Sequence, residues 1–252
     1  MTKQLTYRDP KDFCQTVDGK HIYTIPALDG AALPSVSELL RCSDIEDQSG
    51  LEKWRLQVGQ KQADLISARA CFRGSVVHSM IEVSLLGSDD TQDLAVPESF
   101  SEVDQDRALN EARSIFEASH DVLDRVRAVE FCECAVWHDS LRYAGTLDCL
   151  AEFDGELSLI DWKTAGKQPR FRPTYPYQLC AYATALNRLE GRVVVSTGVS
   201  VVMSPTGAIA KKFDLAKYWP WWIEVCKRYW APRDADRFGL ICGEYEYMGV
   251  AA

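Results

Sequence analysis

Two aspartates and one lysine near the middle of the sequence have the types and spacing that could bind a divalent cation next to a phosphate. Asp154-Gly155 separates two runs rich in β-branched and aromatic residues, which predicts a β-hairpin with a two-residue turn. Counting outward from that turn, one residue on each strand at a time, brings Asp148 opposite Asp161, with Cβ atoms roughly 4.5–5.5 Å apart. Lys163 follows two residues later, so we expect it on the same face as Asp161.

Carboxylates that face each other repel unless a cation lies between them. Mg²⁺ is commonly held by one or two carboxylates and completes its shell with water and substrate phosphate. A neighbouring lysine can orient or help to deprotonate a water and can offset charge on the phosphate. The arrangement suits metal-assisted hydrolysis of phosphodiesters. Its alternative is a surface hairpin with scattered charges, and the hairpin by itself does not decide between the two.

Four further residues lie on predicted helices at spacings that bring them in pairs to one face. His78 follows Gly74, and Glu82 comes one helical turn later. Gln178 and Tyr182 have the same spacing on a helix after the hairpin. Taken singly, a histidine beside apolar residues is more often structural than a metal ligand. The second pair can equally belong to an amphipathic face.

The elements that must position these side chains follow from hydrophobic periodicity. Apolar residues recur at intervals of three and four over residues 50–86, which predicts two or three helices, and the helical pattern resumes from 104 to 126. Further strands and helices are predicted in the second half of the chain. The strands lie at 129–137, 143–153, 156–162, 192–203 and 208–213, and the helices at 175–190 and 215–230. This order predicts one α+β domain rather than a doubly wound sheet.

The chain divides into an N-terminal arm, residues 1–34, and a single domain, residues 35–252. Turn signals are frequent in the arm, and we expect one hairpin in it around residues 20–28. Within the domain, residues 35–126 form a helical region that carries His78, and residues 127–252 form the sheet and the remaining helices.

Composition excludes several classes of protein. The 252 residues are 46% hydrophobic and 26% charged, which is ordinary for a globular chain. No apolar stretch is long enough to span a membrane, and the first residues lack the apolar segment of a signal peptide. The nine cysteines are irregularly spaced, which favours reduced thiols. We therefore expect no membrane partner and a cytoplasmic location.

The formal charge of −9 argues at first against a protein that binds nucleic acid. Seven of the 37 acidic residues, however, lie at 88–106, where no base occurs, so the rest of the chain has 30 acids against 28 bases, a charge of −2. Lys163, Lys167, Arg170 and Arg172 form a basic patch after the hairpin that could grip phosphate. The balance therefore permits local binding of a nucleic acid, with weak non-specific adhesion and strong salt sensitivity.

Four short motifs follow one another along the chain. They are Gly74-x-x-x-His78, Gly145-Thr-Leu-Asp148, Ile160-Asp-Trp-Lys-Thr164 and Gln178-x-x-x-Tyr182. This set resembles the RecB-like branch of the PD-(D/E)XK nucleases, and within it the phage-type exonuclease group that also includes the mitochondrial genome maintenance exonuclease. Sequence segments upstream of these motifs, between residues 33 and 75, also resemble this group, so the resemblance spans about residues 33–190. The literal Pro-Asp of the superfamily is missing, since Leu147 precedes Asp148, a departure that is common in this branch.

The resemblance implies a fold and a metal site. The fold is a restriction-endonuclease-like core, a mixed β-sheet flanked by helices, behind an N-terminal helical region. Asp148 and Asp161 would bind Mg²⁺ or Mn²⁺, and His78 would be a further ligand whose neutral form is needed, so that activity falls at acid pH. Lys163 would activate the attacking water or stabilise the pentacovalent phosphate. Gln178 would steady Lys163 or the metal-bound water.

Other residues receive accessory roles from the same resemblance. Tyr182 would contact the nucleic-acid strand, as would the basic side chains at 167, 170 and 172. Glu133, on the strand before the hairpin, lies where the family often has an acid, although Glu130 is a nearby competitor. Glu82 would lie behind the metal ligands.

The activity that the resemblance implies is that of a metal-dependent DNA exonuclease of phage type, in DNA recombination, repair or degradation. Its substrate would be single-stranded DNA or duplex ends, in a bacterial or phage-infected cell. A recombination protein or a second copy of the chain is a further candidate partner. The alternatives are an endonuclease of the same fold and a catalytically silent scaffold that binds nucleic acid. The presence of every residue of the four motifs favours an enzyme.

Two more patterns have a functional and a structural interpretation. Some RecB-like relatives hold an iron–sulfur cluster with a C-terminal trio of cysteines, but only Cys226 and Cys242 lie there, so we expect no cluster. Cys132 and Cys134 fall on one face of a predicted strand, where buried thiols are favoured over zinc ligands. The aromatic run at 218–222 could stack unpaired bases, although its helical spacing favours packing in the core.

Overall fold

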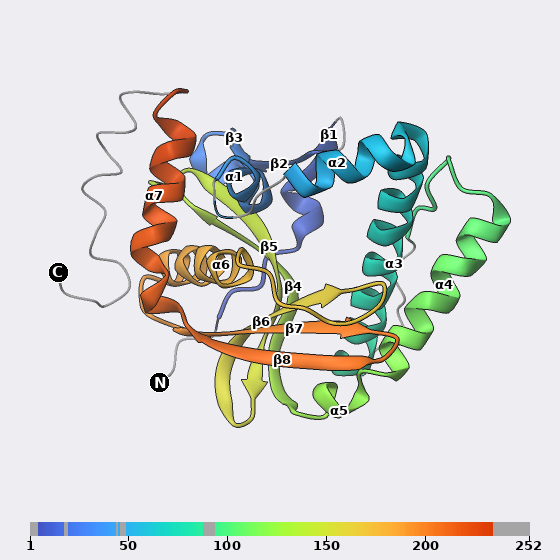
Figure 1. Cartoon of the computed structure of the whole chain (residues 1–252). Helices are drawn as coiled ribbons and strands as arrows, with labels where there is room; N and C mark the ends of the chain where they lie inside the picture. The colour runs from blue at the N-terminus through green and yellow to red at the C-terminus, as the bar shows by residue number, and fades with distance from the viewer. Residues whose placement is uncertain (1–4, 18–19, 44, 46–48, 88–93, 234–252) are drawn as a thin grey trace.

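A five-stranded sheet forms the centre of the molecule (Figure 1). The computed structural model describes residues 5–17, 20–43, 45, 49–87 and 94–233. The strands lie side by side in chain order: β4 (Val126–His138), β5 (Tyr143–Phe153), β6 (Glu156–Thr164), β7 (Thr197–Ser204) and β8 (Gly207–Asp214). Neighbours are antiparallel except for β6 and β7, which are parallel and joined through α6 (Tyr175–Glu190). The sheet is therefore mixed, as predicted.

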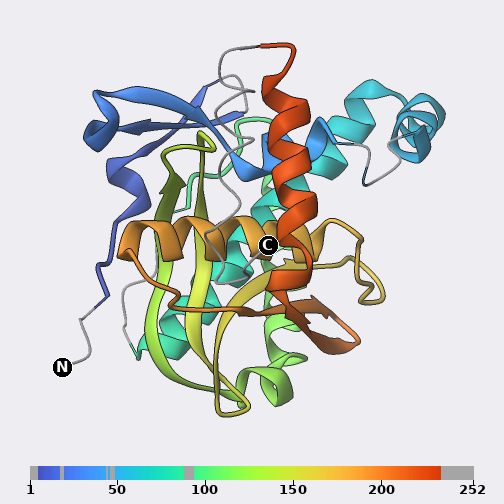
Figure 2. The same cartoon turned by 90° about the vertical axis from the view of Figure 1, so that its left-hand side faces the viewer.

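Helices cover both faces of this sheet. On one face, α6 crosses the strands with α7 (Trp219–Trp230) beside it, as Figure 2 shows, and α1 (Val36–Arg41) completes this layer. On the other face lie α3 (Gln60–Leu86), α4 (Glu102–Glu117) and α5 (His120–Leu123). Each layer has its own apolar cluster: Leu147 packs with the α6 layer, and Phe153 with the α3 layer. Two helix layers around a mixed sheet confirm the α+β class.

The helical region begins and ends where local chemistry requires. The two or three helices predicted over residues 50–86 are two, α2 (Ser49–Val58) and α3. Ser101 and Asp104 form a reciprocal capping box that starts α4 at Glu102, two residues before the predicted start. None of the described helices is long and apolar enough to cross a membrane.

The strand predicted from residue 192 begins only at Thr197. The reason is the buried side chain of Asn187, whose Oδ1 accepts from the N–H groups of Val194 at 2.7 Å and Val195 at 3.1 Å. Its Nδ2 donates to the carbonyl of Val195 at 2.9 Å. The backbone before β7 is thus bound by an amide side chain instead of a neighbouring strand.

The N-terminal arm differs from its prediction of one hairpin around residues 20–28. It forms a three-stranded antiparallel sheet of β1 (Cys14–Val17), β2 (Lys20–Ile25) and β3 (Ala31–Pro34). Residues 26–28 are a short 3₁₀ helix, η2 (Pro26–Leu28), and Asp29 and Gly30 turn the chain with φ of 54° and 72°. The turn that joins β2 to β3 therefore lies later in the chain than the predicted hairpin. The division of the chain at residue 34 stays a prediction.

The register of the hairpin β5–β6 is as predicted. Asp154 and Gly155 have φ of 53° and 78°, as a type I′ turn requires, and the ladder runs from Phe153↔Glu156 to Cys149↔Ile160. It ends there, one pair before the two aspartates. Beyond that point β5 stays paired with β4, while β6 pairs with β7. The two strands separate where Asp148 and Asp161 are located.

Strand β4 departs from simple alternation at Glu133, whose φ is 47°. Cys132 packs with the α3 layer, and Cys134 with the α6 layer. The prediction that the two thiols share a face is wrong, because the left-handed residue between them reverses the sense of alternation. Both thiols are buried, which agrees with the structural interpretation.

Candidate active site

The backbone of Trp162 organises the site where β5 and β6 separate. Its N–H donates to Asp148 Oδ2 at 2.7 Å, and its carbonyl oxygen lies 3.0 Å from His78 Nε2. In a strand, the N–H and C=O of one residue point to the same side, and on this side β5 no longer supplies backbone partners. Buried backbone groups must find partners. Side chains from β5 and α3 supply them, and they are thereby fixed in place.

His78, Glu133 and Asp148 form a group that could hold a metal ion. Their ligand atoms all lie within 4.8 Å of one another. His78 Nδ1 is 3.5 Å from Glu133 Oε1 and 3.9 Å from Asp148 Oδ2. Because a carbonyl oxygen only accepts, Nε2 must donate to Trp162, which directs Nδ1 to the carboxylates. A histidine that donates its other ring N–H to a carbonyl is the usual arrangement of a metal ligand.

Asp161 and Lys163 lie beside this group on β6. Lys163 Nζ donates to Asp161 Oδ1 at 2.7 Å. The Asp161 side chain is 0% exposed, and its Oδ2 has no hydrogen-bond partner among the described residues. A buried carboxylate oxygen without a partner is costly. A divalent cation would satisfy it, so the residues present fit a metal ion.

Burial and mutual charge shift the pKa values of these groups. Burial raises the pKa of Asp161 to about 6, against the opposing attraction of Lys163, and it raises the pKa of Asp148 as well. Burial lowers the pKa of His78, but Asp148 and Glu133 outweigh this effect and raise it to about 9. The carboxylates likewise outweigh burial at Lys163 and raise its pKa. Without metal, the imidazole of His78 is therefore doubly protonated and positively charged at neutral pH.

The motifs around residues 145 and 178 meet in space. Gln178 Nε2 donates to the Tyr182 hydroxyl at 2.9 Å. A Cβ on Gly145 would lie 2.4 Å from Tyr182 Cε1, so only glycine permits this approach. Tyr182 is 5% exposed, and it borders a cavity that Glu133 and Thr146 also line. The structure thus places Tyr182 on the wall of a cavity that Glu133 also lines, and Gln178 is hydrogen-bonded to Tyr182.

The remaining predicted residues lie around this centre. Glu82 is one turn beyond His78 on α3 and outside the group of three. Glu130 is exposed, which leaves Glu133 as the acid that β4 contributes. The basic patch lies mostly on the loop between β6 and α6, where the side chains are exposed: Lys167, Arg170 and Arg172. Of the C-terminal cysteines, Cys226 is buried in the core, and Cys242 lies outside the described residues.

Contributions from the N-terminal arm were missed by sequence reasoning. Tyr7 Oη donates to the carbonyl of Glu133 at 3.4 Å, and the carbonyl of Arg8 accepts from Ala135 N–H at 2.9 Å. Tyr23 Oη lies 3.1 Å from Thr146 Oγ1. These contacts join residues more than a hundred positions apart, and no local pattern indicates them.

Comparison with known proteins agrees with this geometry. A family model described as the PD-(D/E)XK nuclease superfamily matches residues 52–216. Mitochondrial genome maintenance exonuclease 1 of mouse (Mus musculus) is 30% identical over 209 residues, which are 79% of this chain and 56% of that protein. The human (Homo sapiens) protein of the same name is also 30% identical, over 79% of this chain and 55% of its own length. The chain thus spans about half the length of the curated relatives it matches.

Proposed function

The chain belongs to the PD-(D/E)XK nuclease superfamily, and from that membership we propose that it is a metal-dependent DNA exonuclease. The observation that carries the proposal is the meeting of His78, Glu133 and Asp148 with the buried pair of Asp161 and Lys163. The relatives from mouse and human are exonucleases by name, which favours this activity over an endonuclease. A scaffold without catalysis would not need a buried carboxylate with an unsatisfied oxygen.

The mechanism assigns each group a task. A bound divalent cation would lower the pKa of a water and neutralise charge on the phosphate, and Asp148, Asp161, His78 and Glu133 are the groups that would hold it. Lys163 remains charged because of its two carboxylate neighbours. Its Nζ, oriented by Asp161, can donate to a phosphate oxygen as negative charge develops there.

We propose Mg²⁺ or Mn²⁺ as the metal. The three carboxylates are hard oxygen ligands that suit both ions. The imidazole of His78 is tolerated better by Mn²⁺ than by Mg²⁺, because nitrogen ligands suit the transition metals. Among the described side chains at the centre there is no thiolate, which would favour softer metals.

The test is digestion of end-labelled single- and double-stranded DNA in Mg²⁺, in Mn²⁺ and in EDTA. We expect release of nucleotides from ends in either metal and none in EDTA. Asp161→Asn should abolish it, whereas Asp154→Asn, at the exposed turn of the same hairpin, should not. Equal activity of wild type and Asp161→Asn would refute the proposal. Cleavage of covalently closed circles would favour the endonuclease, and binding without cleavage the scaffold.

We further propose that the enzyme acts in DNA recombination, repair or degradation, as phage-type exonucleases do, in a reducing compartment such as the cytoplasm. The thiols of the described cysteines are free, which supports such a compartment. Cell fractionation followed by detection of the protein tests its location. A protein found only in an oxidising compartment would overturn that part.

A further inference from the structure

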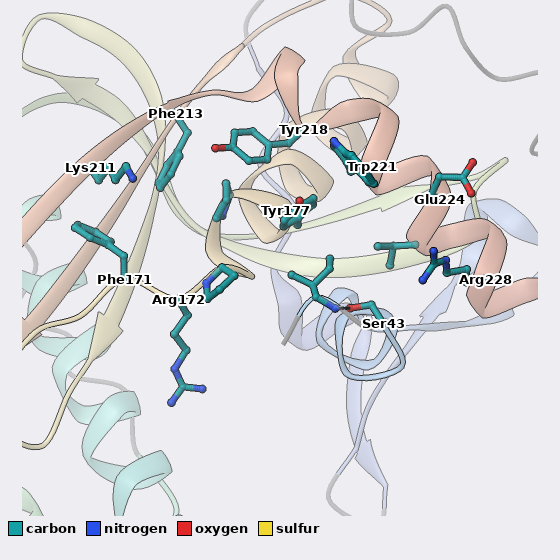
Figure 3. A pocket seen from close by; sticks show the side chains of 14 residues that line it. Ser43, Phe171, Arg172, Tyr177, Lys211, Phe213, Tyr218, Trp221, Glu224 and Arg228 are labelled. Carbon is teal, nitrogen blue, oxygen red and sulfur yellow. Dashed lines mark hydrogen bonds between the residues drawn. The ribbon is translucent and has the colours of Figure 1, made fainter. Parts of the chain in front are cut away.

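A pocket of about 580 Å³ lies between the loop after β6, the start of α6, β8 and α7 (Figure 3). Five of its lining residues are aromatic: Phe171, Tyr177, Phe213, Tyr218 and Trp221. Phe171 and Phe213 lie at one end beside Lys211, and Trp221 lies toward the other end near Arg228 (Figure 3). Flat aromatic side chains therefore line the pocket toward both of these ends.

The described lining of the pocket has a charge opposite to that of the whole chain. Its lining includes the basic residues Arg172, Lys211 and Arg228. Glu224 is the one acid among the lining residues that the structure describes, and Lys227 pairs with it at 2.8 Å. In a chain with a formal charge of −9, the described part of the lining is therefore basic. It would attract an anion that presents flat apolar groups.

Core packing does not account for Trp221. On α7, Trp219 and Trp222 are 4% and 0% exposed, as the helical spacing predicted, but Trp221 is 62% exposed. An indole ring of this exposure is costly to keep in water. Lys211 Nζ, meanwhile, lies 5.3 Å from the ring centroid of Phe213 and 5.9 Å from that of Phe171. The pocket thus presents the ammonium group of Lys211 together with the rings of Phe171 and Phe213.

The pocket and the candidate active site are bordered by the same segment, the loop between β6 and α6 and the first turn of α6. Lys163 Nζ lies 5.7 Å from the ring centroid of Tyr175, at the start of α6. Tyr177, two residues later, lines the pocket. Arg172 belongs to the loop between β6, which ends at Thr164, and α6, and it also lines the pocket. A strand with one phosphate at Lys163 would therefore reach the pocket with its neighbouring nucleotides.

We propose that this pocket binds the bases of a single-stranded segment of the nucleic acid whose phosphodiester lies in the active site. The bases stack on Trp221 and Tyr218, and the phosphates meet Lys211 and Arg172. Stacking on aromatic side chains tolerates any sequence, as an exonuclease requires. The location of the segment rests on the proposed nuclease function, whereas its binding can be measured without cleavage.

The test is fluorescence anisotropy of a labelled oligodeoxythymidine in EDTA. Because a stacked base contributes to binding, Trp221→Ala should weaken affinity by about 5- to 150-fold, and Trp221→Phe should retain most of it. Lys211→Gln should weaken binding, and Lys212→Gln is its matched control. Lys212 is the next residue on β8 and pairs with Glu156 at 3.1 Å, away from the pocket. An abasic strand of equal length should bind wild type and Trp221→Ala equally.

Equal affinity of wild type and Trp221→Ala for the oligodeoxythymidine would refute the pocket, and so would a loss of the same size on the abasic strand. Neither result bears on the nuclease, because Mg²⁺-dependent digestion by wild type is measured separately. Conversely, Trp221-dependent binding in a protein that cleaves no DNA would support the pocket and remove the nuclease function.

Discussion

Replacing Asp161 with asparagine should stabilise the protein in the absence of metal and abolish its stabilisation by metal. The carboxylate is fully buried, one of its oxygens lacks a partner among the described residues, and its pKa is raised to about 6. An acid whose pKa is higher in the folded state contributes stability below its unfolded pKa of 3.8, and this contribution is lost as pH rises through about 6. At pH 7.5 the ionised group is therefore a net cost.

The magnitude follows from the shift. A pKa raised from 3.8 to about 6 corresponds to ~3 kcal/mol of unfolding free energy. Asparagine can keep an oxygen acceptor for Lys163 Nζ, although a neutral oxygen attracts the ammonium less. We therefore expect Asp161→Asn to gain about 1–3 kcal/mol without metal.

Urea denaturation at pH 7.5, in EDTA and in excess Mg²⁺, measures both effects. Wild type should gain about 2.7 kcal/mol at a hundredfold excess of metal over its dissociation constant, and the variant almost nothing. Asp139→Asn is the matched control. Asp139 forms a two-pronged ion pair with Arg188 at 2.9 and 3.1 Å, and its pKa is lowered, so its loss should destabilise in both media. The reasoning fails if Asp161→Asn is less stable than wild type in EDTA.

Three further measurements test other parts of the structure. Metal affinity should rise about tenfold per pH unit from about pH 7 to 8.5, because metal binding displaces the proton that His78 holds with a pKa of about 9. Calorimetry in buffers of different ionisation enthalpy should count about one proton released per metal ion bound. An equal count for His78→Asn would contradict this expectation. Gly145→Ala should lower the free energy of unfolding in urea by about 1–3 kcal/mol, because the added Cβ would lie 2.4 Å from the Tyr182 ring. Gly50→Ala, whose added Cβ meets nothing within 4 Å, is the control, and equal stability of the two variants would be the contrary result. Burial lowers the pKa of His138 to about 3, so its contribution to stability should be constant above about pH 6.5 and should fall by up to ~1.4 kcal/mol per pH unit below it, as the unfolded chain takes up the proton first. His138→Asn should reduce the slope of the unfolding free energy between about pH 4 and 6, and an unchanged slope would exclude this histidine as its cause.

The parts of the site that the sequence could predict are those that local chemistry determines. An Asp-Gly turn has essentially one favoured geometry, so the register from Phe153↔Glu156 to Cys149↔Ile160 followed from counting. The helix that carries His78 followed in the same way from its periodicity. Whether a histidine and an aspartate meet, however, depends on how α3 packs on the sheet, and the four motifs indicated this meeting only through their resemblance to a family.

Other features depend on interactions that no window of sequence contains. Glu133 points to the site because its φ is 47°, a conformation that a glutamate rarely adopts and that the surrounding sheet must enforce. Trp221 reads as one more aromatic residue of an amphipathic helix, and only the packed position of α7 distinguishes it from Trp219 and Trp222. A short apolar period predicts that a helix has a buried face, but it does not say which edge residues stay outside.

The separation of β5 from β6 explains why the chemistry lies at this point of the sheet. A continuing ladder would have paired the backbone of Trp162 with β5. With β5 turned toward β4, the Trp162 N–H and carbonyl bind Asp148 and His78 instead. In the same place Asp161 is buried, and its Oδ2 has neither solvent nor a hydrogen-bond partner among the described residues. The backbone of Trp162 thus fixes Asp148 and His78 before a metal ion binds. Binding of the cation would relieve the free-energy cost of the buried Asp161 carboxylate, and this relief would add to the affinity for the cation.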